Sequence, residues 1–128
     1  AASSRLTASP QSRYQGHVIR LQAWLGARLT DAVSLDEAAA HVGLSRSLLT
    51  REFRRHTGHS IVAWCNLQRI ERAATRLAAS DEAITDVALA CGFANLSHFH
   101  HLFKAHYGLA PAAFRRMVAS RPASENAA

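Results

Sequence analysis

The chain has 128 residues, enough for one compact domain and too few for two conventional ones. Its 15 Lys and Arg against 9 Asp and Glu give a formal net charge of +6, and no long apolar run accompanies them. This balance favours a polyanionic partner, nucleic acid before membrane, although a solvated basic surface has the same composition. Cys65 and Cys91 are far apart, which argues against a disulfide framework and a cysteine-based zinc site and favours two small core residues in a reducing cytoplasm.

The termini differ in composition from the rest of the chain. Residues 1–12 and 119–128 are small, polar and without pattern, so we predict a linker or disordered start and a disordered tail around a domain of residues 13–118. The scarcity of proline between these ends favours an all-α fold of about seven helices. From Tyr14 onward, apolar residues recur at spacings of three and four, which predicts a first packing helix with one buried face: Val18, Leu21, Leu25 and Leu29.

An internal repeat follows, in which residues 35–58 match residues 84–108. The matched pairs are Leu35 with Ile84, Ala39 with Ala88, Val42 with Cys91, Gly43 with Gly92, Leu44 with Phe93, Leu49 with Phe99, Phe53 with Phe103, Gly58 with Gly108, and Trp64 with Phe114. Each copy has the pattern of helix, tight turn, helix and stop. The repeat therefore predicts two helix-turn-helix units, residues 14–58 and 81–118.

Capping signals mark the ends of these helices. Ser34 and Glu37 form a capping-box pattern, and Gly43 supplies the positive φ that a tight corner often needs. Gly58 and Gly108 stand where helix C-caps are expected. Ser60 can cap a linker helix over residues 60–79, about 30 Å long at 1.5 Å per residue.

The second helix of a helix-turn-helix unit is the one that enters a DNA major groove. With Leu49 and Phe53 buried, a rotation of about 100° per residue directs another set of side chains outward: Ser47, Arg51 and Arg54, flanked by Thr50 and Arg55. Arginine can contact guanine O6 and N7 together, and hydroxyl groups can serve base or phosphate. Seven Arg against two acids in residues 45–76 predict that the first unit dominates affinity.

The second copy carries a histidine cluster on the corresponding helix. With Phe99 and Phe103 buried, the outward positions are Ser97, His100, His101 and Lys104. His98 and His106 fall at the shoulder and the buried edge, where packing is the simpler interpretation. Only His98 and His101 have useful ligand spacing, and no carboxylate or cysteine shares their face, so we predict neither a metal site nor a catalytic site. The alternative is a metal- or pH-sensing protein-interaction module that uses residues 97–107.

These residues resemble the AraC/XylS family of bacterial transcription regulators over roughly residues 14–117. The segment "DVALACGFANLSHFHHLFKAHYGLAPAAFRR" looks like the family signature, "LSRSLLTREFRRHTGHS" resembles its first recognition helix, and "LQRIERAATRLAAS" resembles its linker. By position, the resemblance assigns base reading to Arg46, Ser47, Thr50 and Arg51, and to Ser97, His100 and His101. The chain departs from the family at His101, where Arg is common, and at Ala110, where Ser or Thr often precedes the proline.

The resemblance also implies the partners. Two recognition helices would occupy successive major-groove segments of double-stranded DNA, about 10 base pairs apart. RNA polymerase is a further expected partner, and an effector is expected to act only through an N-terminal domain that this chain lacks. We expect no cofactor, no enzymatic activity, no membrane association, and a domain that is monomeric alone in the cytoplasm.

Overall fold

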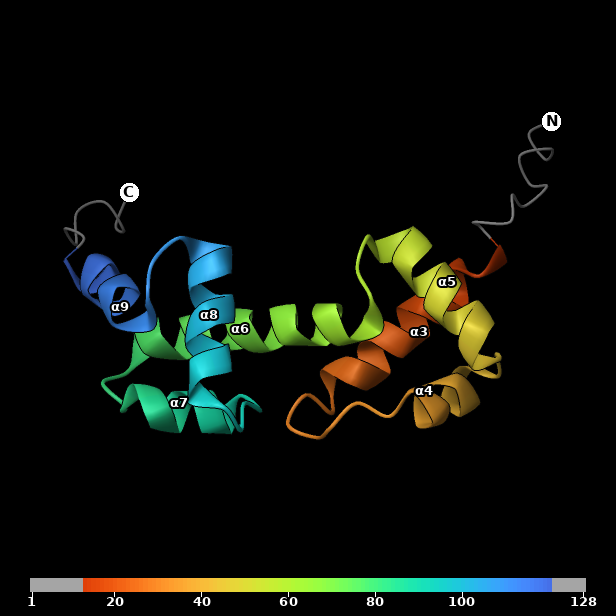
Figure 1. Cartoon of the computed structure of the whole chain (residues 1–128), viewed down its shortest axis with the longest axis horizontal. Coiled ribbons are helices and arrows are strands. Elements are labelled where there is room, and N and C mark those ends of the chain that lie inside the picture. The colour runs from red at the N-terminus through yellow and green to blue at the C-terminus, as the bar shows by residue number, and fades with distance from the viewer. Residues whose placement is uncertain (1–12, 121–128) are drawn as a thin grey trace, which may run out of the picture. The chain divides into compact units, whose positions relative to one another are not determined.

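The computed structural model describes residues 13–120, which form seven helices and no strand (Figure 1). The predicted all-α fold is therefore confirmed. The predicted start, residues 1–12, and residues 121–128 of the predicted tail lie outside the described residues. The last helix ends at Ala119, one residue beyond the predicted end of the domain.

The chain divides into two compact units, of which the first ends at Cys65 and the second begins at Asn66. This division falls within α6 (Ile61–Ala79). The first unit contains α4 (Leu35–Val42) and α5 (Arg46–Thr57), and the second contains α7 (Ile84–Ala90) and α8 (Leu96–Tyr107). Each unit thus holds one of the two predicted helix-turn-helix pairs.

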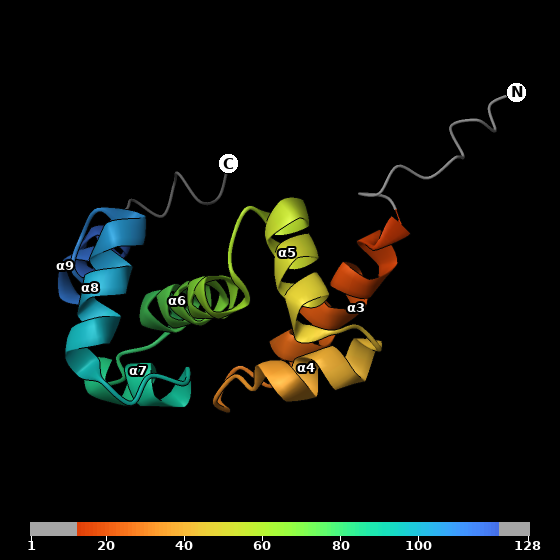
Figure 2. The same cartoon turned by 45° about the vertical axis from the view of Figure 1, so that its right-hand side comes forward.

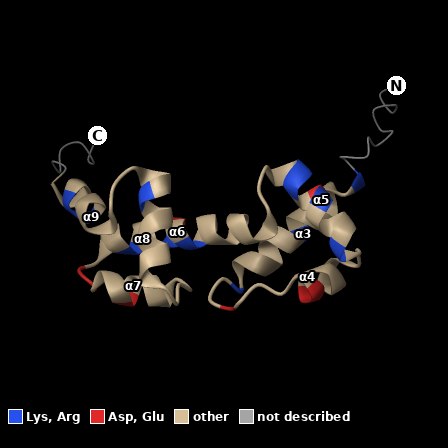
Figure 3. Ribbon diagram, viewed as in Figure 1, with Lys and Arg blue, Asp and Glu red and all other residues tan. Residues whose placement is uncertain are grey.

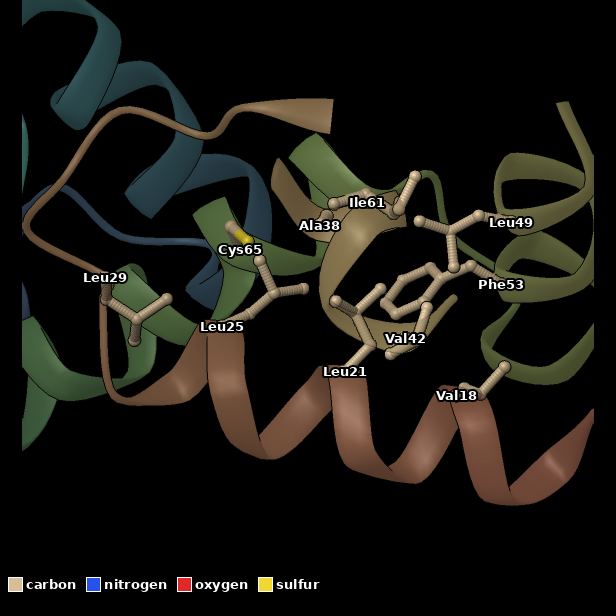
Figure 4. Packing of buried hydrophobic residues seen from close by; sticks show 11 residues of the cluster. Val18, Leu21, Leu25, Leu29, Ala38, Val42, Leu49, Phe53, Ile61 and Cys65 are labelled. Carbon is tan, nitrogen blue, oxygen red and sulfur yellow. The ribbon is translucent and has the colours of Figure 1, made fainter. Parts of the chain in front are cut away.

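The first unit is built on α3 (Gln15–Gly26), which packs against both α4 and α5 (Figure 2). The face of α3 that carries Leu21 is buried as its spacing predicts, and it meets the ring of Phe53 (Figure 4). Leu29 is buried too, but it follows the helix instead of lying on it, because α3 ends at Gly26. Ile61 and Cys65, from the start of α6, complete this core.

The second unit repeats this packing with more aromatic residues. Phe99 and Phe103 are fully buried, with ring centroids 5.7 Å apart. Phe103 also meets Phe114 of α9 (Pro111–Ala119) edge to face at 5.3 Å, as Phe53 meets Trp64 at 5.9 Å in the first unit. The two contacts are equivalent, because the sequence repeat aligns Phe53 with Phe103 and Trp64 with Phe114. Cys91 is buried in this core, and burial raises the pKa of its thiol.

The helix ends confirm the predicted caps. The Ser34 hydroxyl accepts a hydrogen bond from the Glu37 N–H at 3.2 Å, and Ser60 accepts one from the Ala63 N–H at 3.1 Å. Gly43 closes α4 with φ 76°, a conformation that other residues rarely adopt, and its N–H donates to the Ala39 carbonyl. Gly58 and Gly108 close α5 and α8 as predicted.

An ion pair at the C-terminal end of α6 holds the segment that follows this helix. Arg76 donates from Nε and Nη2 to the two carboxylate oxygens of Glu82, at 3.2 and 2.7 Å. The hydrogen bond from Arg76 holds the pKa of the Glu82 carboxyl below its ordinary value, in spite of a desolvation effect in the opposite direction. Ser80 joins the same group by donating to the Arg76 carbonyl at 2.9 Å. This arrangement supplies a partner for a carbonyl near the end of the helix.

Candidate nucleic-acid interface

Helix α5 presents its arginines to solvent because its opposite side forms part of the core. Leu49 and Phe53 are buried there at 1% and 0% exposure. The N-cap Ser45 accepts a hydrogen bond from the Leu48 N–H at 3.2 Å, which fixes where the helix begins. The structure places every predicted contact residue of this helix on the exposed surface: Arg46, Ser47, Thr50, Arg51, Arg54 and Arg55.

The charge on α5 is concentrated, as the blue segments of this helix in Figure 3 show. The helix carries four arginines and one acid, Glu52, whereas α8 carries one lysine and no acid. Arg46, in the first turn, pairs with Asp36 at the start of α4 at 3.3 Å, and both side chains are exposed. Exposed pairs of this kind contribute little to stability, so Arg46 can exchange Asp36 for an anionic ligand at small cost.

Glu52 is a buried residue next to this exposed face that the sequence analysis missed. Its side chain is only 2% exposed, and Arg51 Nε and Arg55 Nη2 lie 3.5 and 3.8 Å from its Oε2 atom. Its Oε1 atom lies 3.7 Å from His56 Nε2. The internal repeat held the signal, because an offset of 50 aligns Glu52 with Leu102 and shows a carboxylate where the second copy has an apolar residue.

Asn95 is the N-cap of helix α8, and its side-chain oxygen accepts a hydrogen bond from the His98 N–H at 2.9 Å. Ser97, His101 and Lys104 are exposed, as the angular analysis predicts. His100 is only half-exposed, because its ring meets the edge of Phe99 and its Nδ1 lies 2.9 Å from the Leu96 carbonyl oxygen. That oxygen can only accept, so a hydrogen bond at this contact requires the hydrogen on Nδ1, which leaves Nε2 as an acceptor in the neutral ring.

The two remaining histidines of α8 are oriented by neighbours in the second unit. His98 meets Phe93 edge to face at 6.2 Å, and His106 meets Tyr107 at 4.6 Å while its Nε2 lies 3.7 Å from Glu71 Oε2. Within residues 13–120, no three or more His, Cys, Asp or Glu side chains come together as metal ligands would. The histidines of α8 therefore belong to separate contacts.

None of the helices within residues 13–120 has the length and apolar character needed to span a membrane.

Comparison with known proteins relates this geometry to characterised ones. A family model described as a helix-turn-helix domain matches residues 38–117. The HTH-type transcriptional activator RhaS of Escherichia fergusonii is 35% identical over 96 residues, which cover 75% of this chain and 34% of that protein. The chain thus spans about a third of the length of this curated relative.

Solved structures share the arrangement of helices. A transcriptional regulator from Chromobacterium violaceum, described as having an AraC-type DNA-binding domain, superposes with a TM-score of 0.78 at 27% identity, over 84% of this chain and 96% of that one. The DNA-binding domain of AdpA, described as a global transcriptional factor in complex with a target DNA, superposes with a TM-score of 0.72 at 30% identity, over 78% of this chain and 90% of that one.

Proposed function

Because this chain belongs to the helix-turn-helix family, we propose that α5 and α8 are its two recognition helices. The chain is an AraC-type double helix-turn-helix domain for sequence-specific DNA binding in transcription regulation. The proposed domain covers residues 13–118, with a first unit over 14–58, a linker helix over 60–79 and a second unit over 81–118. The observation that carries the proposal is the exposed, arginine-rich face of α5 opposite its buried Leu49 and Phe53.

In the first unit, Arg51 is the proposed base reader. Its side chain is 66% exposed and lies in the middle of the outward face, where a guanidinium can bond guanine O6 and N7 together. Thr50 lies about one turn and Ser47 about two turns before Arg54 on the same exposed surface, and their hydroxyls can bond base edges or phosphates. Arg46, which the family resemblance assigns to base reading, is proposed to contact a base edge. Arg54 and Arg55 are proposed to contact mainly phosphates, so the first unit supplies most of the salt-dependent affinity.

In the second unit, Ser97, His100, His101 and Lys104 are the proposed contacts of α8. The orientation of His100 defines its chemistry, because neutral Nε2 can accept a hydrogen bond from adenine N6 or cytosine N4. Lys104 supplies the only fixed positive charge of this helix, which is consistent with a smaller share of the affinity.

The two helices are proposed to read two boxes in one DNA site. Helix-turn-helix half-sites recur about one helical turn, or 10 base pairs, apart. Two different recognition helices in one chain would then read an asymmetric site, with no need for a dimer. The family resemblance supports this proposal, as does the AdpA domain, described as bound to a target DNA.

The partners of the intact protein are also proposed on the basis of its relatives. The chain spans only 34% of the RhaS activator, so we propose that an N-terminal domain receives an effector and that the present domain is monomeric alone. We propose transcription activation through RNA polymerase, in the cytoplasm of a bacterium, because relatives of this chain are named transcriptional activators. No cofactor and no enzymatic step enters this function.

The test is selection of binders from a random duplex library by the purified chain at moderate salt. Two enriched boxes about 10 base pairs apart would support the double readout, with more information in the box read by α5. Recovery of no motif would refute sequence-specific binding. Zinc added during selection serves as a control, since readout by α5 and α8 needs no metal.

A further inference from the structure

Glu52 is a buried acid in the middle of α5, the helix that is proposed to bind a polyanion. Its side chain is 2% exposed, and a buried carboxylate is costly unless positive or hydrogen-bonding groups surround it. Two of its neighbours are Arg51 and Arg55, both on the proposed DNA-binding face. The carboxylate therefore lies beneath the groups that the first unit would use.

The second unit shows that the fold itself does not require this acid. At the aligned position it has Leu102, which packs against the core of that unit. The aligned neighbours change as well, because His101 replaces Arg51 and Ala105 replaces Arg55. The acid is thus present in the copy that has both arginines and absent from the copy that has neither.

We propose that Glu52 is a positioning residue that holds Arg51, with Arg55, in the orientation required for base reading. This inference rests on the proposed function of α5. Oε2 of Glu52 is 3.5 Å from Arg51 Nε, so it engages the inner edge of the guanidinium. The two terminal nitrogens of Arg51 remain available for a paired contact with guanine, and a side chain held in advance loses less rotamer freedom on binding.

A role in stability alone is the competing explanation, and the second unit does not favour it, because Leu102 packs at the aligned position without an acid. The three contacts to the carboxylate measure 3.5 to 3.8 Å, longer than charge-assisted hydrogen bonds of about 2.8 Å. Neither Glu52 Oε1 nor His56 Nε2 has a hydrogen-bond partner within the described residues. Exchange of a buried ion pair for a packed apolar side chain is often neutral or stabilising.

The two roles predict different results for Glu52→Leu, which introduces the residue of the second copy, and for Glu52→Gln, which keeps the shape. The readout is the ratio of affinities for the selected site and for random duplex, with the unfolding free energy measured in parallel. A positioning role predicts that the ratio falls about fivefold, near the lower limit for one paired arginine contact. The protein should remain as stable as the wild type.

Glu71→Gln is the matched control for charge, because it removes an exposed carboxylate of α6 and raises the net charge equally. It should tighten binding to random DNA as the Glu52 variants do and leave the ratio unchanged. In an Arg51→Ala background, Glu52→Gln should produce no further loss of the ratio. An additive loss, or an unchanged ratio in the single variants, would overturn the proposal.

The outcomes also separate this inference from the proposed function. If the wild-type chain selects no motif, both are wrong. If it selects a motif and the Glu52 variants keep the full ratio, only the positioning role is wrong. If Glu52→Leu fails to fold, stability is the main role of the acid, and a full ratio in Glu52→Gln would confirm that result.

Discussion

The uncapped start of α9 allows a quantitative prediction about stability. Ala110 is the N-cap residue of this helix, and it makes no side-chain cap hydrogen bond. Its backbone angles, φ −65° and ψ 156°, nearly equal those of the N-cap Ser45, φ −71° and ψ 157°, whose hydroxyl accepts from the N–H three residues later at 3.2 Å. A serine hydroxyl at position 110 should therefore reach the Ala113 N–H without movement of the backbone.

The substitution Ala110→Ser should stabilise the second unit by about 1 kcal/mol, the usual difference between serine and alanine at an N-cap. Pro111 does not reduce this gain, because the proline lacks only the N1 hydrogen, whereas the cap bonds the N–H at N3. Ala110 is exposed, so the new hydroxyl loses little hydration. For a unit of this size, 1 kcal/mol corresponds to a rise in Tm of about 4–8 °C.

Chemical unfolding followed by circular dichroism measures the effect, and Ser60→Ala is the matched control. Ser60 is aligned with Ala110 in the repeat and caps α6 from the first unit, so its loss should cost about the same free energy. Tryptophan fluorescence follows the first unit, since Trp24 and Trp64 are the only tryptophans of the chain. An unchanged midpoint in Ala110→Ser, at an unchanged slope, would refute the proposed cap geometry.

Three further results are expected. Arg51→Ala should cost about 1–3 kcal/mol on the selected site and less on random duplex; equal losses would assign Arg51 to a phosphate. Arg76 lowers the folded-state pKa of Glu82, so the stabilising effect of the Glu82 carboxylate should be complete above the ordinary glutamate pKa of 4.5 and decline as the pH falls through the folded pKa. The variant Glu82→Gln should therefore show a flatter dependence of stability on pH in that range. Selection with His100→Phe, which removes the ring nitrogens, should remove the preference for adenine or cytosine at the base that faces His100 in the box read by α8.

Much of the fold could be predicted because the signals are local and repeated. The spacing of Val18, Leu21 and Leu25 identifies one buried face, and the aligned Phe53 and Phe103 identify two equivalent cores. Glycine at positions 43, 58 and 108 adopts a positive φ that few other residues adopt, so the ends of these helices could be predicted from the sequence. Leu29 marks the limit of this reasoning, since apolar spacing continues there although the helix has already ended.

The outward faces of α5 and α8 were equally accessible to prediction, because two buried residues fix the rotation of a helix. The orientation of individual side chains was not. Angular position alone makes His100 as exposed as His101, but only the structure shows its hydrogen bond to the Leu96 carbonyl and hence which nitrogen is available. A hydrogen bond depends on rotamer and distance, neither of which appears in residue spacing.

Glu52 was missed because an acid in a basic helix is usually a solvated residue that lowers the local charge. At about 100° per residue, Glu52 lies about 60° from Leu49 around the helix axis, on the boundary between the buried and the exposed face, where spacing cannot decide burial. The repeat carries the missing information, since Leu102 shows that this boundary position is apolar in the copy without arginines. Comparison of the two copies residue by residue thus separates what the helix-turn-helix fold requires from what the proposed DNA recognition by α5 would require.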